Sequence, residues 1–312
     1  MSNLSQKWRD HQFLLKADKK TELFYSHTGA GCIGQKLSES KYEYYLTVRN
    51  NLNQSLIFEG ILTVGDDKSQ LDFLSYNDPV LTNGSIGMFD ENGVSYPHSI
   101  IIKDEHFLLY TGWMQTVKTP FQNHLGMAKK SDHLFERVSK APILPRSNED
   151  PLSTGSVCVL KDSDRWHLWY TSFLKWGEGE NEPKHSYSIK YAYSHDGFHW
   201  NRQNQLCIDP QLPHEHSIAR PSVIKYKNLF HMWFCYRGEH YKIGYATSID
   251  GIKWERKDHE CYFLSSGHDW DSKDQCYPHI FKHKNYLYMT YAGNNYGNYG
   301  IGIARMNIED LQ

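Results

Sequence analysis

The feature that most constrains the fold is an internal repeat in the second half of the chain. One segment reads Y-A-Y-S-H-D-G-F-H-W-N-R from Tyr191 to Arg202, and another reads Y-A-T-S-I-D-G-I-K-W-E-R from Tyr245 to Arg256. The two segments begin 54 residues apart and share seven residues at the same offsets. Self-similarity at a fixed period indicates a repeat architecture, in which each copy forms one supersecondary unit.

A second element recurs upstream of this repeat, as an apolar strand, a short polar turn and an aromatic strand. The turns include K-D-E-H, K-D-S-D and Y-K-N, which are typical of hairpin connections. The aromatic strands carry an aromatic residue at equivalent positions, which are Tyr45, Tyr110, Tyr170, Phe234 and Tyr291. Successive positions are separated by 65, 60, 64 and 57 residues, so the chain contains five units of similar length.

Both elements together predict an all-β chain. Its 22 Tyr, 14 Phe and 9 Trp favour strands, and five units of four antiparallel strands predict a five-bladed β-propeller. We expect a single domain over residues 1–312, with segment 8–20 closing the ring as a strand or capping it. The S-x-D-G-x-x-W segment is interpreted as a scaffold hairpin whose Trp packs between neighbouring sheets. The predicted blades span residues 23–65, 96–140, 155–205, 218–262 and 277–308.

Charge and hydropathy exclude several functional classes. The chain has 34 Lys and Arg against 36 Asp and Glu, a net charge of −2 that argues against binding to nucleic acid. No apolar run is long enough to span a membrane, and the first residues do not resemble a secretory signal. We therefore expect a cytoplasmic protein without a membrane partner, in which the six scattered cysteines are small apolar fillers.

The candidate site lies where the loops lead into the first strand of each unit. In a propeller these strands line a central channel, so side chains from distant units converge at one end of it. The loops and the strands beside them contain carboxylates, His, Arg and aromatic residues, a mixture that suits a sugar ligand. The candidate substrate-binding residues are His27, Arg49, Trp113, Arg220, Arg237, Tyr277 and His279.

The repeat and the Pro-containing strand starts Y-P-H-S-I, R-P-S-V-I and Y-P-H-I-F resemble a known superfamily. They are similar to the five-bladed glycosidase-like propellers of glycoside hydrolase families 32, 43, 68 and 130 and their unassigned relatives. The resemblance covers residues 23–308. It implies carboxylates at the channel mouth, one acting as base or nucleophile and one as general acid. On this pattern Asp90 is the base or nucleophile, Glu149 the acid and Asp271 an alternative partner.

The chain also departs from the family pattern. The loop into the first unit offers His27 where the family has an acid, and Tyr96, Arg220 and Tyr277 precede the prolines. One interpretation is a glycosidase-like enzyme that acts on a glycoside or an activated sugar in surface-polysaccharide metabolism. The other is a non-catalytic carbohydrate-binding propeller, or a glycoside phosphorylase or transferase. The arginines favour an anionic sugar.

Metal and cofactor sites are not expected. His27, His98 and His279 could approach the channel from three blades and bind an ion such as zinc, but no H-E-x-x-H motif occurs. The chain also contains neither a P-loop nor a strand–G-x-G-x-x-G–helix unit. We therefore expect a small-molecule sugar or glycan as the partner, with no metal and no cofactor.

Overall fold

The computed structural model describes residues 7–177, 185–211 and 215–311. In these residues it contains 20 β-strands, the four-residue helix α1 (Asn294–Gly297) and three 3₁₀ turns. The prediction of a chain that is nearly all β is confirmed. Among the described residues, no helix is long and apolar enough to cross a membrane. The 3₁₀ turns span Asp258–Glu260, Asp269–Asp271 and Ile308–Asp310.

Four groups contain strands that are consecutive in the sequence and pair antiparallel. The first group is β2 (Gly31–Lys36), β3 (Lys41–Arg49), β4 (Ser55–Thr63) and β5 (Gln70–Asp72). The second is β6 (Gly93–Ile102), β7 (Glu105–Met114), β8 (Gln122–Ser131) and β9 (Leu134–Arg137). The third is β10 (Thr154–Asp162), β11 (Arg165–Trp176), β12 (His185–Ser194) and β13 (Asn201–Ile208). The fourth is β14 (Ser217–Tyr226), β15 (Leu229–Arg237), β16 (Tyr241–Ser248) and β17 (Glu255–Arg256).

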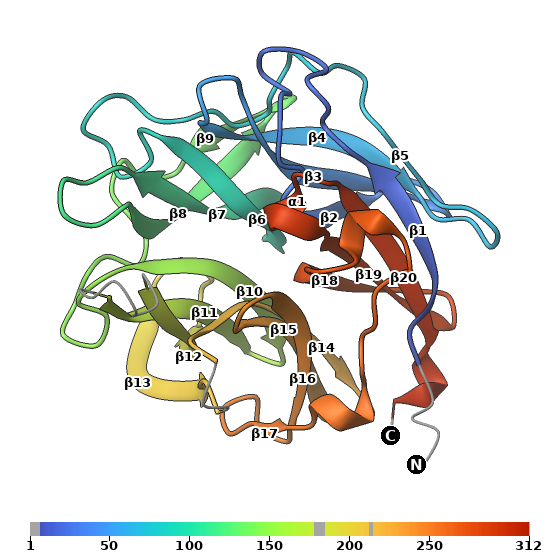
Figure 1. Ribbon diagram of the computed structural model, residues 1–312. Coiled ribbons are helices and arrows are strands. Elements are labelled where there is room, and N and C mark those ends of the chain that lie inside the picture. The colour runs from blue at the N-terminus through green and yellow to red at the C-terminus, as the bar shows by residue number, and fades with distance from the viewer. Residues whose placement is uncertain (1–6, 178–184, 212–214, 312) are drawn as a thin grey trace.

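A fifth group joins the two ends of the described chain. It contains β18 (Cys276–His283), β19 (Tyr286–Ala292) and β20 (Ile301–Asn307). Its fourth strand is β1 (Arg9–Leu15), which pairs antiparallel with β20 and lies beside it in Figure 1. Of the two expectations for this segment, the closing strand is therefore the observed one.

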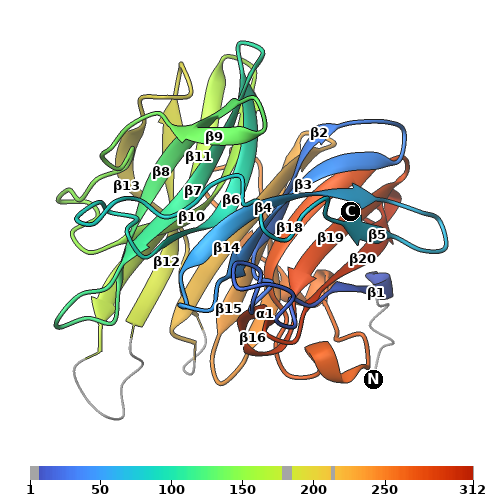
Figure 2. The same ribbon diagram turned by 90° about the horizontal axis from the view of Figure 1, so that it is seen from above.

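The first strands of the groups lie around a common centre, and Figure 2 shows the groups side by side from above. β2 contacts β6, β6 contacts β10, β10 contacts β14, β14 contacts β18, and β18 contacts β2 again. Side chains at equivalent positions reinforce this cycle by accepting a backbone N–H from the next group. The bonds run from Val159 to His98 (2.9 Å), Val223 to Cys158 (3.2 Å), Ile280 to Ser222 (2.8 Å) and Ile33 to His279 (3.1 Å).

The repeat motif forms the scaffold turn that the sequence predicts. Ser248 Oγ accepts the Gly251 N–H at 2.8 Å, while Asp250 Oδ1 accepts two backbone N–H groups at 2.8 Å. Gly251 has a φ of 72°, a left-handed conformation that glycine adopts without strain. The Trp254 ring packs edge-on against Trp169 of the neighbouring group, with the centroids 5.9 Å apart. The scaffold interpretation is thus confirmed.

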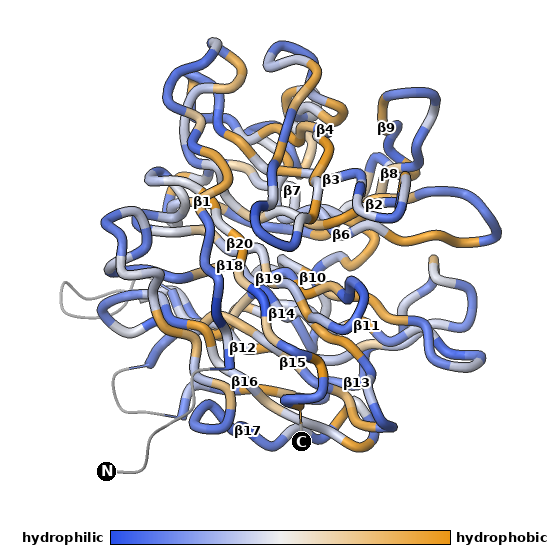
Figure 3. Tube along the Cα trace, turned by 90° about the vertical axis from the view of Figure 1, so that its right-hand side faces the viewer, coloured by the Kyte–Doolittle hydropathy of each residue, from blue (hydrophilic) through white to orange (hydrophobic). Residues whose placement is uncertain are grey.

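The tube in Figure 3, coloured by hydropathy, shows hydrophobic residues along the strands and hydrophilic residues at many of the loop tips. The five equivalent aromatic residues of the second strands are completely buried. The six cysteines are buried free thiols, as the apolar-filler interpretation expects. Burial raises the pKa of Cys158 to about 11, so its thiol is neutral and unreactive at neutral pH.

Candidate functional site

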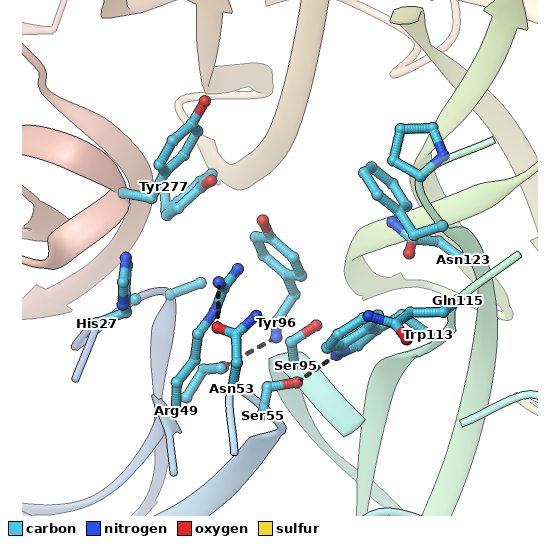
Figure 4. Close-up of a pocket in the computed structure, with 16 residues that line it drawn as sticks. His27, Arg49, Asn53, Ser55, Ser95, Tyr96, Trp113, Gln115, Asn123 and Tyr277 are labelled. Carbon is cyan, nitrogen blue, oxygen red and sulfur yellow. Dashed lines mark hydrogen bonds between the residues drawn. The ribbon is translucent and has the colours of Figure 1, made fainter. Parts of the chain in front are cut away.

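A pocket with a volume of about 310 Å³ lies between strand groups one, two and five, and we call it the central pocket. Its walls come from the loop before β2, the ends of β3 and β7, the starts of β4, β6, β8 and β18, and the α1 turn. Figure 4 shows its labelled side chains facing one another across the open space. The lining residues are His27, Gly29, Ala30, Thr47, Arg49, Asn53, Ser55, Ser95, Tyr96, Trp113, Gln115, Pro120, Phe121, Asn123, Tyr277 and Tyr296.

Strained backbone presents two of these side chains. Tyr96 and Tyr277 have φ angles of 52° and 57°, and so does their equivalent Arg220, at 52°. Each precedes a proline at a point where the strand pairing shifts register. Residues with a side chain rarely adopt this left-handed conformation, and such strain gathers at functional sites. The three bulges bring these side chains together, with the rings of Tyr96 and Tyr277 5.1 Å apart and the Arg220 guanidinium 6.0 Å from Tyr96.

The two pocket phenols are neutral at physiological pH. Burial raises the pKa of Tyr96 to about 12 and that of Tyr277 well above its usual value of 10. Their hydroxyl groups can therefore donate or accept hydrogen bonds without adding charge.

Arg49 supplies the positive charge of the central pocket. Its Nη1 donates to Asn53 Oδ1 at 2.8 Å, which fixes one side of the guanidinium. Burial, followed by the nearby Arg49 charge, lowers the pKa of His27 to about 4, so this imidazole is neutral at pH 7. No carboxylate belongs to the lining within the described residues. The pocket therefore favours a ligand that is anionic or neutral and rich in hydrogen-bonding groups.

Trp113 gives the opposite wall an aromatic surface. Its Nε1 donates to Ser55 Oγ at 2.7 Å, and this bond fixes the orientation of the indole ring. Gln115 and Asn123 lie beside it and add amide groups (Figure 4). An aromatic ring next to amides can take the C–H face of a sugar while its hydroxyl groups are hydrogen-bonded.

Some of the predicted substrate-binding residues lie in this pocket and others do not. His27, Arg49, Trp113 and Tyr277 line it. Arg237 lies next to the pocket, with its guanidinium 5.5 Å from the ring of the lining residue Tyr296.

Arg220 and His279 do not belong to the pocket lining, although the Arg220 guanidinium lies 6.0 Å from the ring of the lining residue Tyr96. Their assignment as substrate contacts stays a prediction. Arg220 is 1% exposed, and its Nη2 donates to the carbonyls of Gly31 and Pro97 at 2.9 and 3.0 Å. His279 is 8% exposed and accepts the Ile33 N–H. These side chains hold neighbouring first strands together.

The acids Asp90 and Asp271 are buried within their own strand groups and do not line the pocket. Asp90 Oδ2 accepts bonds from Tyr110 Oη at 3.0 Å and from Arg137 Nε at 2.8 Å. Asp271 accepts from Tyr291 Oη at 2.8 Å. Both carboxylates are 0% exposed, so the structure gives them a scaffold role. Their catalytic assignment stays a prediction that this geometry does not support.

Glu149 also lies outside the pocket lining, in the loop that leads into β10. A hydrogen bond with Ser147 is the main cause that lowers the pKa of its carboxyl group. A glycosidase general acid requires a raised pKa, so this environment opposes the predicted role. The three predicted catalytic acids are thus not brought together at the pocket.

In four strand groups a buried acid accepts hydrogen bonds from a tyrosine, an arginine or both, and we call this contact the carboxylate clamp. In the third group, Asp150 accepts from Tyr170 Oη at 2.8 Å and from Arg202 Nη1 at 3.1 Å. In the fourth, Glu215 and Arg256 form a bidentate pair at 2.7 and 2.8 Å. The clamps of the second and fifth groups are the Asp90 and Asp271 contacts just described. Asp90, Asp150 and Asp271 each lie 20 residues before their tyrosine, so a sequence signal for a repeated scaffold contact existed.

Sequence reasoning missed the pocket residues that come from other loops. Asn53 lies in the β3–β4 hairpin, and Gln115 and Asn123 lie near the ends of β7 and β8. Tyr296 lies in α1, within the Gly- and Asn-rich turn after β19. These residues do not recur from group to group, so the repeat carried no signal for them. Within the described ranges, no three His, Cys, Asp or Glu side chains lie together as a metal-binding group.

Comparisons with known proteins give sequence relatives and structural neighbours. No protein-family model matches the chain. The chain is 35% identical over 264 residues to "Uncharacterized protein MT1551" and "Uncharacterized protein Rv1502" of two Mycobacterium tuberculosis strains. Each alignment covers 84% of this chain and 87% of the relative.

The structural neighbours are glycoside hydrolases and related proteins. A structure of BT0996 in a complex with RGII superposes with a TM-score of 0.72 at 15% identity, and the match covers 97% of this protein and 92% of the neighbour. A thermostable family-43 glycoside hydrolase superposes with a TM-score of 0.60 at 16% identity, covering 91% and 90%. At this identity the likeness shows the fold alone, which is that of the propeller glycosidases.

Proposed function

Because the chain belongs to the family of the M. tuberculosis proteins MT1551 and Rv1502 and has the propeller glycosidase fold, we propose that it binds a carbohydrate in the central pocket. The strand groups are then the blades of one five-bladed propeller domain over residues 1–312. The contact cycle of β2, β6, β10, β14 and β18 supports this arrangement. A sugar at the end of the ring would contact three blades at once.

The proposed ligand is a sugar that carries a carboxylate or a phosphate, within a glycan or as an activated sugar. The observation that carries this proposal is the charge of the pocket, where Arg49 is the charged group and no carboxylate lines the described walls. Arginine binds planar anions in a bidentate way, and Asn53 already holds one side of this guanidinium. Its remaining N–H groups are available to a ligand.

A role in surface-polysaccharide metabolism and a cytoplasmic location remain predictions from the sequence. Neither depends on the geometry of the pocket. The binding proposal can therefore be tested with purified protein, whatever the biological source of the sugar.

Hydrolysis of a glycoside is the second candidate function. The observation in its favour is the fold that the chain shares with glycoside hydrolases. It requires carboxylates at the sugar, and the predicted acids Asp90 and Asp271 are instead buried in clamps. A phosphorylase or transferase would need fewer protein carboxylates, because phosphate or another acceptor would replace the attacking water.

Calorimetry with matched ligands tests the proposal. Neutral hexoses, the corresponding uronic acids and sugar phosphates would be titrated into the wild type, Arg49→Met and the control Arg165→Met. We expect saturable binding of an acidic sugar that weakens roughly 10- to 100-fold in Arg49→Met, the range for a bond to a charged group, and is unchanged in the control. Equal affinity for neutral and acidic sugars, or an unchanged Arg49→Met, would refute it.

The same samples separate binding from catalysis. After overnight incubation with glycosides, mass spectrometry should find the ligands intact if the pocket only binds them. Release of free sugar would favour hydrolysis, and formation of a sugar phosphate in phosphate buffer would favour phosphorolysis.

A further inference from the structure

Arg220 places a full positive charge at the centre of the ring, almost completely buried. Its Nη2 donates to two backbone carbonyls, but among the described residues its Nε and Nη1 have no hydrogen-bond partner. Burial lowers the pKa of this guanidinium, yet arginine stays charged at neutral pH. An isolated buried charge with unpaired donors is costly, so the folded protein requires something that compensates it.

The side chains around Arg220 supply no negative charge. The ionisable groups that interact with its charge include the thiols of Cys32 and Cys158, the phenols of Tyr44 and Tyr96, and the imidazoles of His98 and His279. Burial raises the pKa of the Cys32 and Cys158 thiols to about 12 and 11, so both remain neutral. Burial also raises the pKa of both tyrosines. In the part of the chain that the structure describes, no carboxylate forms an ion pair with Arg220.

Two buried histidines lie near the guanidinium and add no negative charge. His98 Nε2 lies 2.9 Å from Val159 N and 3.1 Å from Val159 O, and His279 Nε2 accepts the Ile33 N–H at 3.1 Å. Burial and the Arg220 charge lower the pKa of both imidazoles, to about 4 for His98, so both are neutral at pH 7. Among the described residues, the surroundings of Arg220 therefore offer no anionic acceptor.

We propose that a small monovalent anion, of the size and charge of chloride, binds at the centre of the ring against Nε and Nη1 of Arg220. An anion there would satisfy the unpaired guanidinium N–H groups and neutralise its charge. The small size follows from the 1% exposure of Arg220, which leaves no room for a sugar.

The anion site is not part of the central-pocket lining, since Arg220 does not line that pocket, although its guanidinium lies 6.0 Å from the ring of the lining residue Tyr96. It links four strand groups, since Arg220 is on β14 and contacts Gly31 of β2 and Pro97 of β6, while His279 is on β18. The anion would therefore act on the stability of the whole ring, independently of any sugar.

Thermal unfolding in different sodium salts at constant ionic strength tests this proposal. Chloride or bromide would replace isethionate, an organic sulfonate that is larger than a halide and is not a sugar acid. We expect a saturable increase in Tm of roughly 2–5 °C once the halide exceeds its Kd about tenfold. A Tm that is equal in chloride, bromide and isethionate would overturn the proposal and leave water as the occupant.

A pair of variants locates the effect. Arg220→Met removes the charge at similar side-chain length and should abolish the halide dependence. Arg165→Met should retain the halide dependence, because the Arg165 guanidinium lies over the aromatic ring of Tyr193, away from the centre of the five strand groups. A halide dependence that persists in Arg220→Met would contradict the assignment.

Crystallography covers the case in which Arg220→Met does not fold. Wild-type crystals soaked in bromide should show an anomalous peak within hydrogen-bond distance of Arg220 Nη1 or Nε. Bromide peaks confined to the protein surface would overturn the proposal.

Discussion

The carboxylate clamps and the central pocket are both built from charged and aromatic side chains, but they differ in periodicity. The clamps recur in four strand groups, each with a buried acid, and three of them at a spacing of 20 residues from a tyrosine. The pocket residues Arg49, Trp113 and Tyr296 have no such recurrence. The recurrent buried acids therefore belong to the scaffold, whereas the pocket combines residues that occur once with the recurrent bulge residues Tyr96 and Tyr277.

The largest expected effect concerns Asp90, a clamp residue that the sequence proposed as catalytic. Asp90→Asn should lower the free energy of unfolding by about 3–5 kcal/mol, because it removes the buried negative charge that pairs with Arg137 and puts an amide N–H₂ group among the Tyr110 and Arg137 donors. Urea denaturation measures this loss. The control Glu105→Gln removes an exposed pair with Lys129 and should cost less than about 1 kcal/mol. If Asp90→Asn keeps full stability and loses turnover of a glycoside, the catalytic role is correct.

Acid should destabilise the ring through its buried imidazoles. The pKa of His98 is about 4 when folded, below its usual value of 6.5, because burial disfavours the charged ring. Its contribution to stability is thus complete above pH 6.5 and is lost as the pH falls toward 4. Between pH 6.5 and 5 the loss is about 2 kcal/mol for this residue, measurable by urea denaturation at each pH.

His98→Asn sharpens this prediction, since its Oδ1 can still accept the Val159 N–H. The variant should show a smaller slope of stability against pH. His199→Asn, at an exposed position, should leave the slope unchanged. Equal slopes in the wild type and His98→Asn would contradict the argument.

Trp113 tests the aromatic wall of the pocket. Trp113→Ala should weaken sugar binding roughly tenfold, because the ring face and its apolar contact area are lost. Trp113→Phe keeps an aromatic ring but loses the hydrogen bond to Ser55, so its affinity should lie between those of the wild type and Trp113→Ala. Calorimetry with the best sugar of the panel measures both. Unchanged affinity in Trp113→Ala would exclude this wall from the binding site.

The smallest effect is expected for the stability of Arg49→Met. In the part of the chain that the structure describes, the Arg49 guanidinium is hydrogen-bonded to the neutral side chain of Asn53, so its removal should change the free energy of unfolding by less than about 0.5 kcal/mol. Urea denaturation of Arg49→Met and Asp90→Asn under the same conditions compares the two losses of unfolding free energy directly. A loss as large as that of Asp90→Asn would show that Arg49 is scaffold and would break the distinction drawn above.

The fold was predictable because its determinants are local and repeated. The turn of the repeat motif forms within a few residues, because the side chains of Ser248 and Asp250 accept backbone N–H groups that lie close by in the sequence. The buried aromatic positions follow the same period. The partners of the acids were not predictable in this way, because Asp90 and Arg137 lie 47 residues apart and meet only in the folded sheet.

The pocket was only partly predictable, for a related reason. His27 and Tyr277 lie where the chain enters the first strand of a group, and the expectation that the site gathers at these entries predicted both residues. Asn53 and Tyr296 come from a hairpin and a turn whose lengths vary between groups, so no rule of position applies to them. The arrangement around Arg220 depends on four strand groups meeting at one point, which no single segment encodes.

The pairing of β1 with β20 has a consequence for biosynthesis. The last sheet requires a strand from residues 9–15 and its partner from residues 301–307, so it cannot be completed until residues 301–307 have left the ribosome. Until then β1 must wait as an unpaired edge, and such edges promote aggregation. Nascent chains of this protein should therefore depend on chaperones late in translation, and circular permutation that joins β1 directly to β20 should relieve this dependence.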